Sequence, residues 1–184
     1  MDDLAHQLGI SKKTIYQHFS DKDDIISLAT EQYLRDGREA VKALSAESHD
    51  AIDALIKINS YLNRNNRETT SSLLFDLQKY HQKAWRLMQD FKQNFLSAII
   101  RENLVNGIEA GIFREDIQPH IATIVRMEEA SMVFDEQLFP KSKFNLNEVS
   151  EALLANFILG LSTDKGRKLY KRYKHRSGIA LDLN

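Results

Sequence analysis

Residues 1–22 read MDDLAHQLGISKKTIYQHFSDK, and this stretch decides the architecture of the N-terminal part of the chain. From Leu4 to Leu8 the apolar residues recur at helical spacing, and Gly9 follows where a residue with positive φ lets that helix end. Ser11 then precedes a second helical run, residues 12–19, as an N-cap whose hydroxyl can accept a free backbone N–H. The stretch therefore predicts a helix-turn-helix.

Polar side chains cover the outer side of the second predicted helix. Ile15 and Phe19 face inward, which leaves cations, hydroxyls and an amide facing outward. Lysine neutralises phosphate, hydroxyls donate to phosphate oxygens, and glutamine can pair bidentately with an adenine edge in the major groove. A glycine turn between two short helices that binds nothing is the alternative. We predict a DNA-binding surface made of Ser11, Lys12, Lys13, Thr14, Tyr16, Gln17, His18 and Lys22.

Residues 9–29, GISKKTIYQHFSDKDDIISLA, resemble the DNA-binding signature of the TetR family of bacterial transcriptional repressors. The resemblance implies two roles for these side chains. One group would hold phosphates, and Lys13 and Gln17 would reach bases. The phosphate-holding group comprises Lys12, Thr14, Tyr16, His18 and Lys22.

Family members begin with a further amphipathic helix that packs across the two helices of the motif. Here the sequence starts at Met1, within or just before the first helix of the motif. Without that helix one wall of the core would be missing and an apolar patch would be exposed, made of Leu4, Leu8, Ile15 and Phe19. We therefore expect a missing N-terminal segment, or else poor DNA binding by this form.

The composition favours an all-α protein. Only two prolines and seven glycines occur among 184 residues, and no sustained alternation of apolar and polar residues is present. The absence of cysteine suits a reducing cytoplasm, and no apolar run approaches the roughly 20 residues that span a bilayer. We expect a cytoplasmic protein that does not enter the membrane.

A polar break divides the chain into two expected domains. Ser20 to Asp23 has the Ser-x-x-acid form of a capping signal, and a third helix is predicted from Lys22 to about Leu44. The segment SAESHD, residues 45–50, follows it. We expect a helix-turn-helix domain with its connector helix at residues 1–46, and a helical domain for effector binding and dimerisation at residues 47–184.

The body should contain helices at about 51–62 and 71–81, then a longer one reaching Ile108, with Gly111 as a C-cap. The segment NGIEAGIFREDIQP, residues 106–119, also resembles the family's connector. Two helices follow, at about 120–138 and 147–162, and the second is apolar nearly all round. Such a helix must be covered on two sides. We predict a homodimer through these two helices; a central helix buried within one subunit is the alternative.

A densely basic segment, KGRKLYKRYKHR at residues 165–176, ends the helical pattern. It could contact nucleic acid. Basic residues near a helix end also suit the helix dipole, and we favour a solvated helix face for this segment.

The densest aromatic stretch of the body carries the candidate effector site. In the family, such helices line a cavity that admits an apolar or aromatic small molecule. Ordinary core packing explains aromatic residues at helical spacing equally well. The candidates are Tyr80, His81, Trp85, Met88 and Phe91.

No catalytic motif is present. There is no glycine-rich phosphate loop, no Gly-x-Ser-x-Gly and no His-Glu-x-x-His, and Glu128 and Glu129 are spaced like charges on a helix surface. We expect no enzyme activity, no cofactor and no metal.

The sequence predicts a homodimeric, ligand-responsive repressor that binds a near-palindromic operator. The alternative is a helical dimer that binds a small molecule or a protein and no longer binds DNA.

Overall fold

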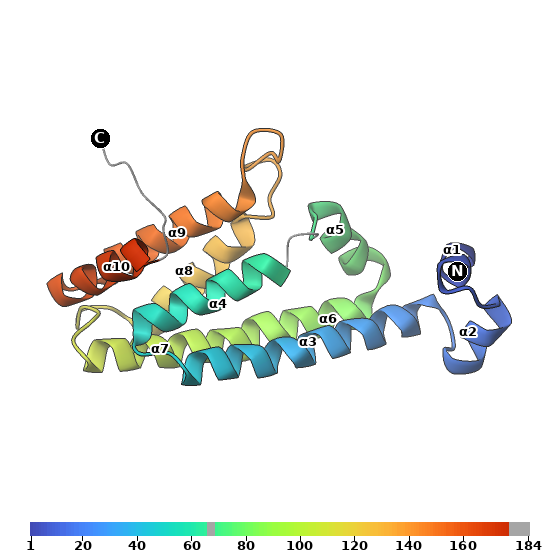
Figure 1. The fold of residues 1–184 in the computed structure, drawn as a ribbon, viewed down its shortest axis with the longest axis horizontal. Helices are drawn as coiled ribbons and strands as arrows, with labels where there is room; N and C mark the ends of the chain where they lie inside the picture. Colours follow the sequence, from blue (N-terminus) through green and yellow to red (C-terminus); the bar gives the residue numbers. More distant parts are fainter. Residues whose placement is uncertain (66–68, 177–184) are drawn as a thin grey trace.

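The structure, a computed structural model, describes residues 1–65 and 69–176, and in that part of the chain it is built from helices without a β-strand (Figure 1). The expected all-α fold is thus confirmed. Bridge pairing among these residues is limited to one isolated antiparallel bridge between Phe113 and Ser162. No helix of the described residues is long and apolar enough to cross a bilayer.

Three helices form the N-terminal part, α1 (Asp2–Leu8), α2 (Lys12–His18) and α3 (Lys22–Ala46). Gly9 ends α1 with φ of 64°, as its position predicted, since a left-handed backbone costs glycine little. The helix-turn-helix pair α1–α2 lies at one end of the molecule, and α3 extends from it along the body (Figure 1).

The cap of α3 differs from the sequence prediction by one residue. The N-cap is Asp21, whose carboxylate accepts the backbone N–H of Asp24 at 2.8 Å, and Ser20 is outside the helix. The Asp24 carboxylate in turn accepts the backbone N–H of Ser20 at 3.1 Å. Because an ionised carboxylate is a stronger acceptor than a hydroxyl, the Asp21–Asp24 pair closes the first turn in place of Ser20–Asp23.

The first half of the body contains α4 (Ala51–Asn65), α5 (Ser71–Tyr80), α6 (Gln82–Asp90), the π-helical turn η1 (Phe91–Leu96) and α7 (Ser97–Glu109). The last three form one continuous rod that lies beside α3 (Figure 1). The expected break between α5 and α6 falls at His81, with φ −126° and ψ 63°. Helix α4 continues past its expected end at Leu62.

Three more helices follow, α8 (Pro119–Met132), α9 (Leu146–Leu161) and α10 (Asp164–Arg176). Pro119 occupies the first turn of α8, as predicted. The prediction that α8 extends to Leu138 was wrong by six residues. Beyond Met132 the chain forms turns in which the Asp135 carboxylate accepts the backbone N–H of Gln137, and this local bond competes with helical hydrogen bonding.

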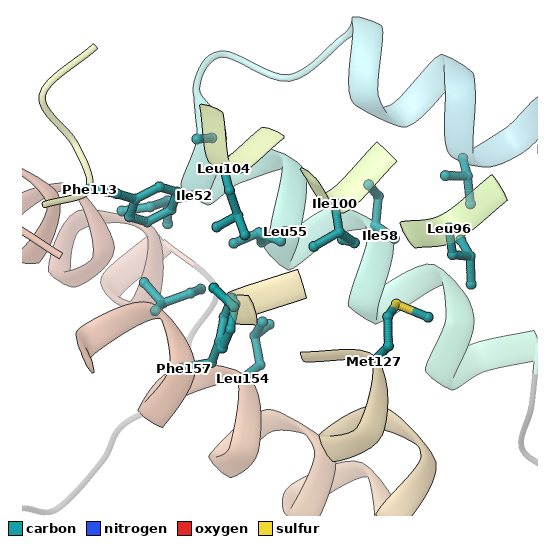
Figure 2. Close-up of a cluster of buried hydrophobic side chains, with 14 of the residues drawn as sticks. Ile52, Leu55, Ile58, Leu96, Ile100, Leu104, Phe113, Met127, Leu154 and Phe157 are labelled. Carbon is teal, nitrogen blue, oxygen red and sulfur yellow. The ribbon is translucent and has the colours of Figure 1, made fainter. Parts of the chain in front are cut away.

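The main core is centred on α4. Figure 2 shows its Ile52, Leu55 and Ile58 facing residues of the η1–α7 rod on one side and residues of α8 and α9 on the other. Phe113 is fully buried beside Gly107, where a Cβ atom would lie 2.3 Å from the phenyl ring. The rod and the last helices are therefore held against one shared helix. The partners of α4 in this view are Leu96, Ile100, Leu104, Met127, Leu154 and Phe157.

Candidate nucleic-acid interface

Local hydrogen bonds fix the start of α2. The Ser11 hydroxyl accepts the backbone N–H of Thr14 at 3.0 Å and lies 2.9 Å from the Thr14 hydroxyl. One turn further on, Ile15 is 3% exposed and anchors the helix to the core of the N-terminal helices, α1, α2 and the start of α3, which we call the headpiece. The cap and the anchor together set which side of this short helix faces solvent.

The outer side of α2 carries the residues that the sequence assigned to DNA. Tyr16 is half exposed, Thr14 is partly buried, and the other side chains are exposed. The structure therefore exposes these residues around the part of α2 that is turned away from Ile15, and on the turn before the helix. The exposed members are Ser11, Lys12, Lys13, Gln17 and His18.

Lys12 already has an anionic partner. Its ammonium group forms an ion pair with the Asp2 carboxylate at the start of α1, and this hydrogen bond lowers the pKa of Asp2 and raises the pKa of Lys12. Both side chains are exposed to solvent, so the pair is weak. A phosphate that approached Lys12 would have to share or displace Asp2.

Lys22 lies exposed at the first turn of α3 among three aspartates, Asp21, Asp23 and Asp24. The carboxylates of Asp21 and Asp24 accept backbone N–H groups of the cap. Negative charge at a helix N-terminus is favourable, so these residues contribute to the start of α3. Lys22 is the cation of this turn that is available to an external anion.

The apolar support of the headpiece is thin. Ala5 and Ile15 are buried and Phe19 is partly buried, whereas Leu8, which the sequence assigned to the core, is 58% exposed. Leu28 on α3 is also exposed. Ser27 is fully buried, and its hydroxyl has no hydrogen-bond partner among the described residues.

A polar contact joins the headpiece end of α3 to the body. His81 Nδ1, at the break between α5 and α6, lies 2.7 Å from Asp23 Oδ1 in the first turn of α3. The sequence analysis proposed His81 as an effector candidate and did not reveal this contact, because the two residues are distant along the chain. The break in the helix brings the ring to Asp23, next to Lys22.

The other effector candidates lie along the same rod. Tyr80 is 61% exposed, Trp85 and Met88 are partly buried, and Phe91 is buried. The Phe91 ring lies over Gly37 of α3, and the guanidinium carbon of Arg38 is 5.4 Å from its centroid. The structure therefore places the buried end of this stretch between the rod and α3.

A buried polar cluster between α4, α8 and α9 was missed by the sequence analysis. Arg126 is 6% exposed and donates from Nη2 to Asn59 Oδ1 at 2.6 Å, and the Ser150 hydroxyl donates to the same oxygen at 3.2 Å. Burial lowers the pKa of Arg126. Arginine at a helical core position is the signal that could have revealed the cluster.

Glu129, which the sequence assigned to a helix surface, is partly buried instead. Its carboxylate is 3.8 Å from Arg126 Nη1, and one of its oxygens has no hydrogen-bond partner among the described residues. Burial raises the pKa of Glu129, and the nearby Arg126 charge lowers it by a smaller amount. This carboxyl group therefore holds a proton more tightly in the folded chain than in the unfolded chain.

Helices α8 and α9 present an apolar outer face. Ile124 is 63% exposed, Ile121 is 49% exposed, and Val125 and Leu159 are also exposed. An open groove of about 490 Å³ runs over this face. Its lining includes Ile121, Val125, Glu129, Asn156 and Gly160. Because the buried residues of α9 lie on one side of the helix, α9 is not a central helix of a single subunit.

The N-terminal residues and the fold define a helix-turn-helix regulator with an all-α body. Residues 1–29 match the model of the "Bacterial regulatory proteins, tetR family". The chain is also 24% identical over 166 residues to the "Uncharacterized HTH-type transcriptional regulator YvaF" of Bacillus subtilis (strain 168), with 90% of this chain and 86% of that protein covered. At its N-terminus the chain thus resembles the TetR family, and over most of its length it is similar to a helix-turn-helix transcriptional regulator.

Two solved structures share the fold. The reduced form of Escherichia coli NemR has a TM-score of 0.66 at 14% identity, covering 89% of this chain and 86% of the other. The TetR family transcriptional regulator PfmR from Thermus thermophilus has a TM-score of 0.62 at 24% identity, covering 88% of each chain. The likeness of fold therefore covers most of the chain.

Proposed function

We propose that this TetR-family regulator is a repressor that binds a near-palindromic operator through α2, as a homodimer in the cytoplasm. The observation that carries the proposal is the outer face of α2, where the Ser11 cap and the Ile15 anchor leave the polar side chains available to DNA. Residues 1–46 would form the DNA-binding domain with its connector, and residues 47–184 the effector and dimer domain.

The proposed contacts divide into two kinds. Lys12, Thr14, Tyr16, His18 and Lys22 would hold phosphates, which fixes the position of α2 on the duplex without reading sequence. Lys13 and Gln17 would reach base edges in the major groove, since lysine suits guanine and glutamine suits adenine. Ser11 acts through the helix cap.

Two headpieces are needed because one offers few cations. Residues 1–22 contain three lysines and three aspartates, so a single headpiece has little excess positive charge. A dimer would place two α2 helices about 34–36 Å apart, or a multiple of that distance, in successive major grooves. The exposed apolar face of α8 and α9 supports a dimer through these two helices, because a monomer in water would leave Ile124 and Ile121 unburied.

An unknown small-molecule effector would act on the spacing of the headpieces through α3. This helix packs along α6 and joins the body at His81 through Asp23, so a shift of the rod would reach the turn that carries Lys22. Trp85, Met88 and Phe91 are the body residues proposed to face the effector, with Tyr80 and His81 at the end of the same stretch. A ligand that favours the wrong headpiece spacing would release DNA, with a coupling free energy of about 1–3 kcal/mol.

The test is DNA binding by the full chain across a salt series, with the DNA that flanks its coding region as probe. Tyr16→Ala and Lys22→Ala should weaken binding to all sequences alike. Gln17→Ala should relax preference at particular base pairs by about 1–3 kcal/mol each. Lys42→Ala, at an exposed position of α3 away from the motif, is the matched control.

Selective binding with a steep salt slope would support the operator proposal. The absence of selective binding would refute it and favour the alternative of a helical dimer that binds a small molecule or protein. An unchanged base preference in the Gln17 variant would remove that residue from base reading.

A further inference from the structure

We infer that the outer face of α10 is a second, sequence-independent surface for the phosphate backbone of duplex DNA. The helix carries seven lysine and arginine residues against one aspartate, a formal charge of +6, whereas the whole chain has a net charge of −1. The rest of the chain is therefore acidic on balance. The strongest concentration of positive charge lies on α10 and not on the headpiece.

Residues at the start of α10 form contacts that hold the helix in place. The Thr163 hydroxyl donates to Gly111 and Ile112 carbonyl oxygens, and Lys165 Nζ donates to the Ala110 carbonyl oxygen at 2.7 Å. Gly166 is buried where a Cβ atom would lie 2.3 Å from the Ile112 carbonyl oxygen. These contacts hold the start of α10 against the end of α7.

Three of the later cations of α10 form no such contact. Lys168, Lys171 and Arg172 are exposed, and within the described residues none of them forms an ion pair with a carboxylate. With Lys165, they line one open hollow on the helix. Like charges held this close repel one another, and a bound polyanion would relieve that repulsion. Binding would also release counterions from the polyanion, which makes the free energy of binding more favourable.

The chemistry of this surface fits a nucleic-acid backbone better than a lipid bilayer. A helix that lies in a membrane interface needs an apolar side to insert beside its basic side. In α10 the apolar residues Leu169, Tyr170 and Tyr173 are partly or fully buried against the body, and Tyr173 donates its hydroxyl to Asp50 at 2.6 Å. The exposed face offers cations without an apolar anchor.

The position of α10 determines which DNA it can contact. It lies at the end of the molecule opposite α1 and α2 (Figure 1), and α3 alone, with 25 residues, spans about 37 Å between the headpiece and the body. A duplex seated on α2 would not reach α10. The surface would therefore hold a second segment of DNA and let one regulator bridge two segments.

The test uses the full chain and a duplex without an operator, in a background where three of the proposed headpiece contacts are removed by Lys13→Ala, Tyr16→Ala and Lys22→Ala. Adding Lys168→Ala, Lys171→Ala and Arg172→Ala should flatten the slope of log affinity against log salt by about 2.7, because each lost phosphate contact accounts for about 0.9. The control removes the same charge from exposed positions elsewhere, Lys42→Ala, Lys83→Ala and Arg101→Ala.

A second assay uses the intact headpiece. An immobilised duplex from the DNA that flanks the coding region should capture a labelled non-operator duplex when α10 is native, and should lose that capture when the three α10 cations are replaced. Circular dichroism checks the fold of each variant, and the triple glutamine variant replaces the triple alanine variant where helicity is lost.

Equal salt slopes for the α10 and control variants would overturn the inference. So would binding to vesicles containing phosphatidylserine without binding to the duplex, which would reassign the surface to an anionic bilayer. Headpiece variants report on operator binding separately, so failure of this inference leaves the proposed operator function intact.

Discussion

Replacing Ile124 by glutamate should break the proposed dimer. Ile124 is 63% exposed in one chain, so about two thirds of its side chain is available for burial by a partner. Full burial of an isoleucine side chain stabilises by about 1.5–3 kcal/mol, which gives about 1–2 kcal/mol for the exposed part. A two-fold interface contains the residue twice, so the loss is about 2–4 kcal/mol.

That free energy corresponds to a roughly 30- to 1,000-fold weaker dimer. The estimate is a lower bound, because the new carboxylate would also lose hydration on association. Sedimentation velocity over a concentration series measures the dissociation constant directly. Operator affinity should fall in the same variant, because separate headpieces no longer bind two half-sites together.

The matched control is Leu73→Glu, where the leucine is 46% exposed and belongs to α5, outside the proposed interface helices α8 and α9. It should leave the dimer unchanged. A dissociation constant in the Ile124 variant equal to that of the native chain would refute the reasoning, and so would an equal effect of both substitutions.

Four further substitutions test other features of the structure. Ser11→Ala removes the cap of α2 and should destabilise the headpiece by about 1 kcal/mol, measured by hydrogen exchange in α2. Gly107→Ala places a Cβ atom 2.3 Å from the Phe113 ring and should lower the free energy of unfolding by about 1–3 kcal/mol in denaturant titrations, and an unchanged midpoint would contradict this packing. Glu129→Gln should stabilise the chain at neutral pH, because burial raises the pKa of the glutamate and so penalises its charged form. The gain in the free energy of unfolding should shrink as the pH falls through that raised pKa, and a gain that does not change with pH would contradict this account. His81→Ala removes the contact with Asp23 and should weaken operator binding about 2- to 10-fold, which is the value of one hydrogen bond. An unchanged operator affinity in a filter-binding assay would show that this contact does not support DNA binding.

Local sequence predicted some helix ends correctly and one wrongly. The structure confirms the helix boundaries predicted from Gly9, Ser11 and Pro119. These residues act through their own backbone or through hydrogen bonds to near neighbours. The end of α8 was wrong because apolar spacing continues past Met132, whereas the Asp135 side chain forms turns that spacing does not reveal.

The candidate site also has a part that local sequence predicts and a part that it does not. The outward residues of α2 follow from the helical period and the identity of Ile15, so the sequence could place them away from the core. The His81–Asp23 contact and the Arg126–Asn59 hydrogen bond join residues more than fifty positions apart. No local pattern encodes such pairs, because they depend on how α3 lies against α6 and how α8 lies against α4.

By itself, the sequence determined the all-α class, the helix-turn-helix and the polar face of α2, because helical period, capping and glycine conformation act within a few residues. Tertiary structure alone decided which faces meet. It buried Arg126 and part of Glu129 and joined His81 to the first turn of α3. It also left Ile124 exposed on one surface, and Lys168, Lys171 and Arg172 exposed on another. The physical reason is that burial and charge pairing depend on packing between helices, which the spacing of residues within one helix does not specify.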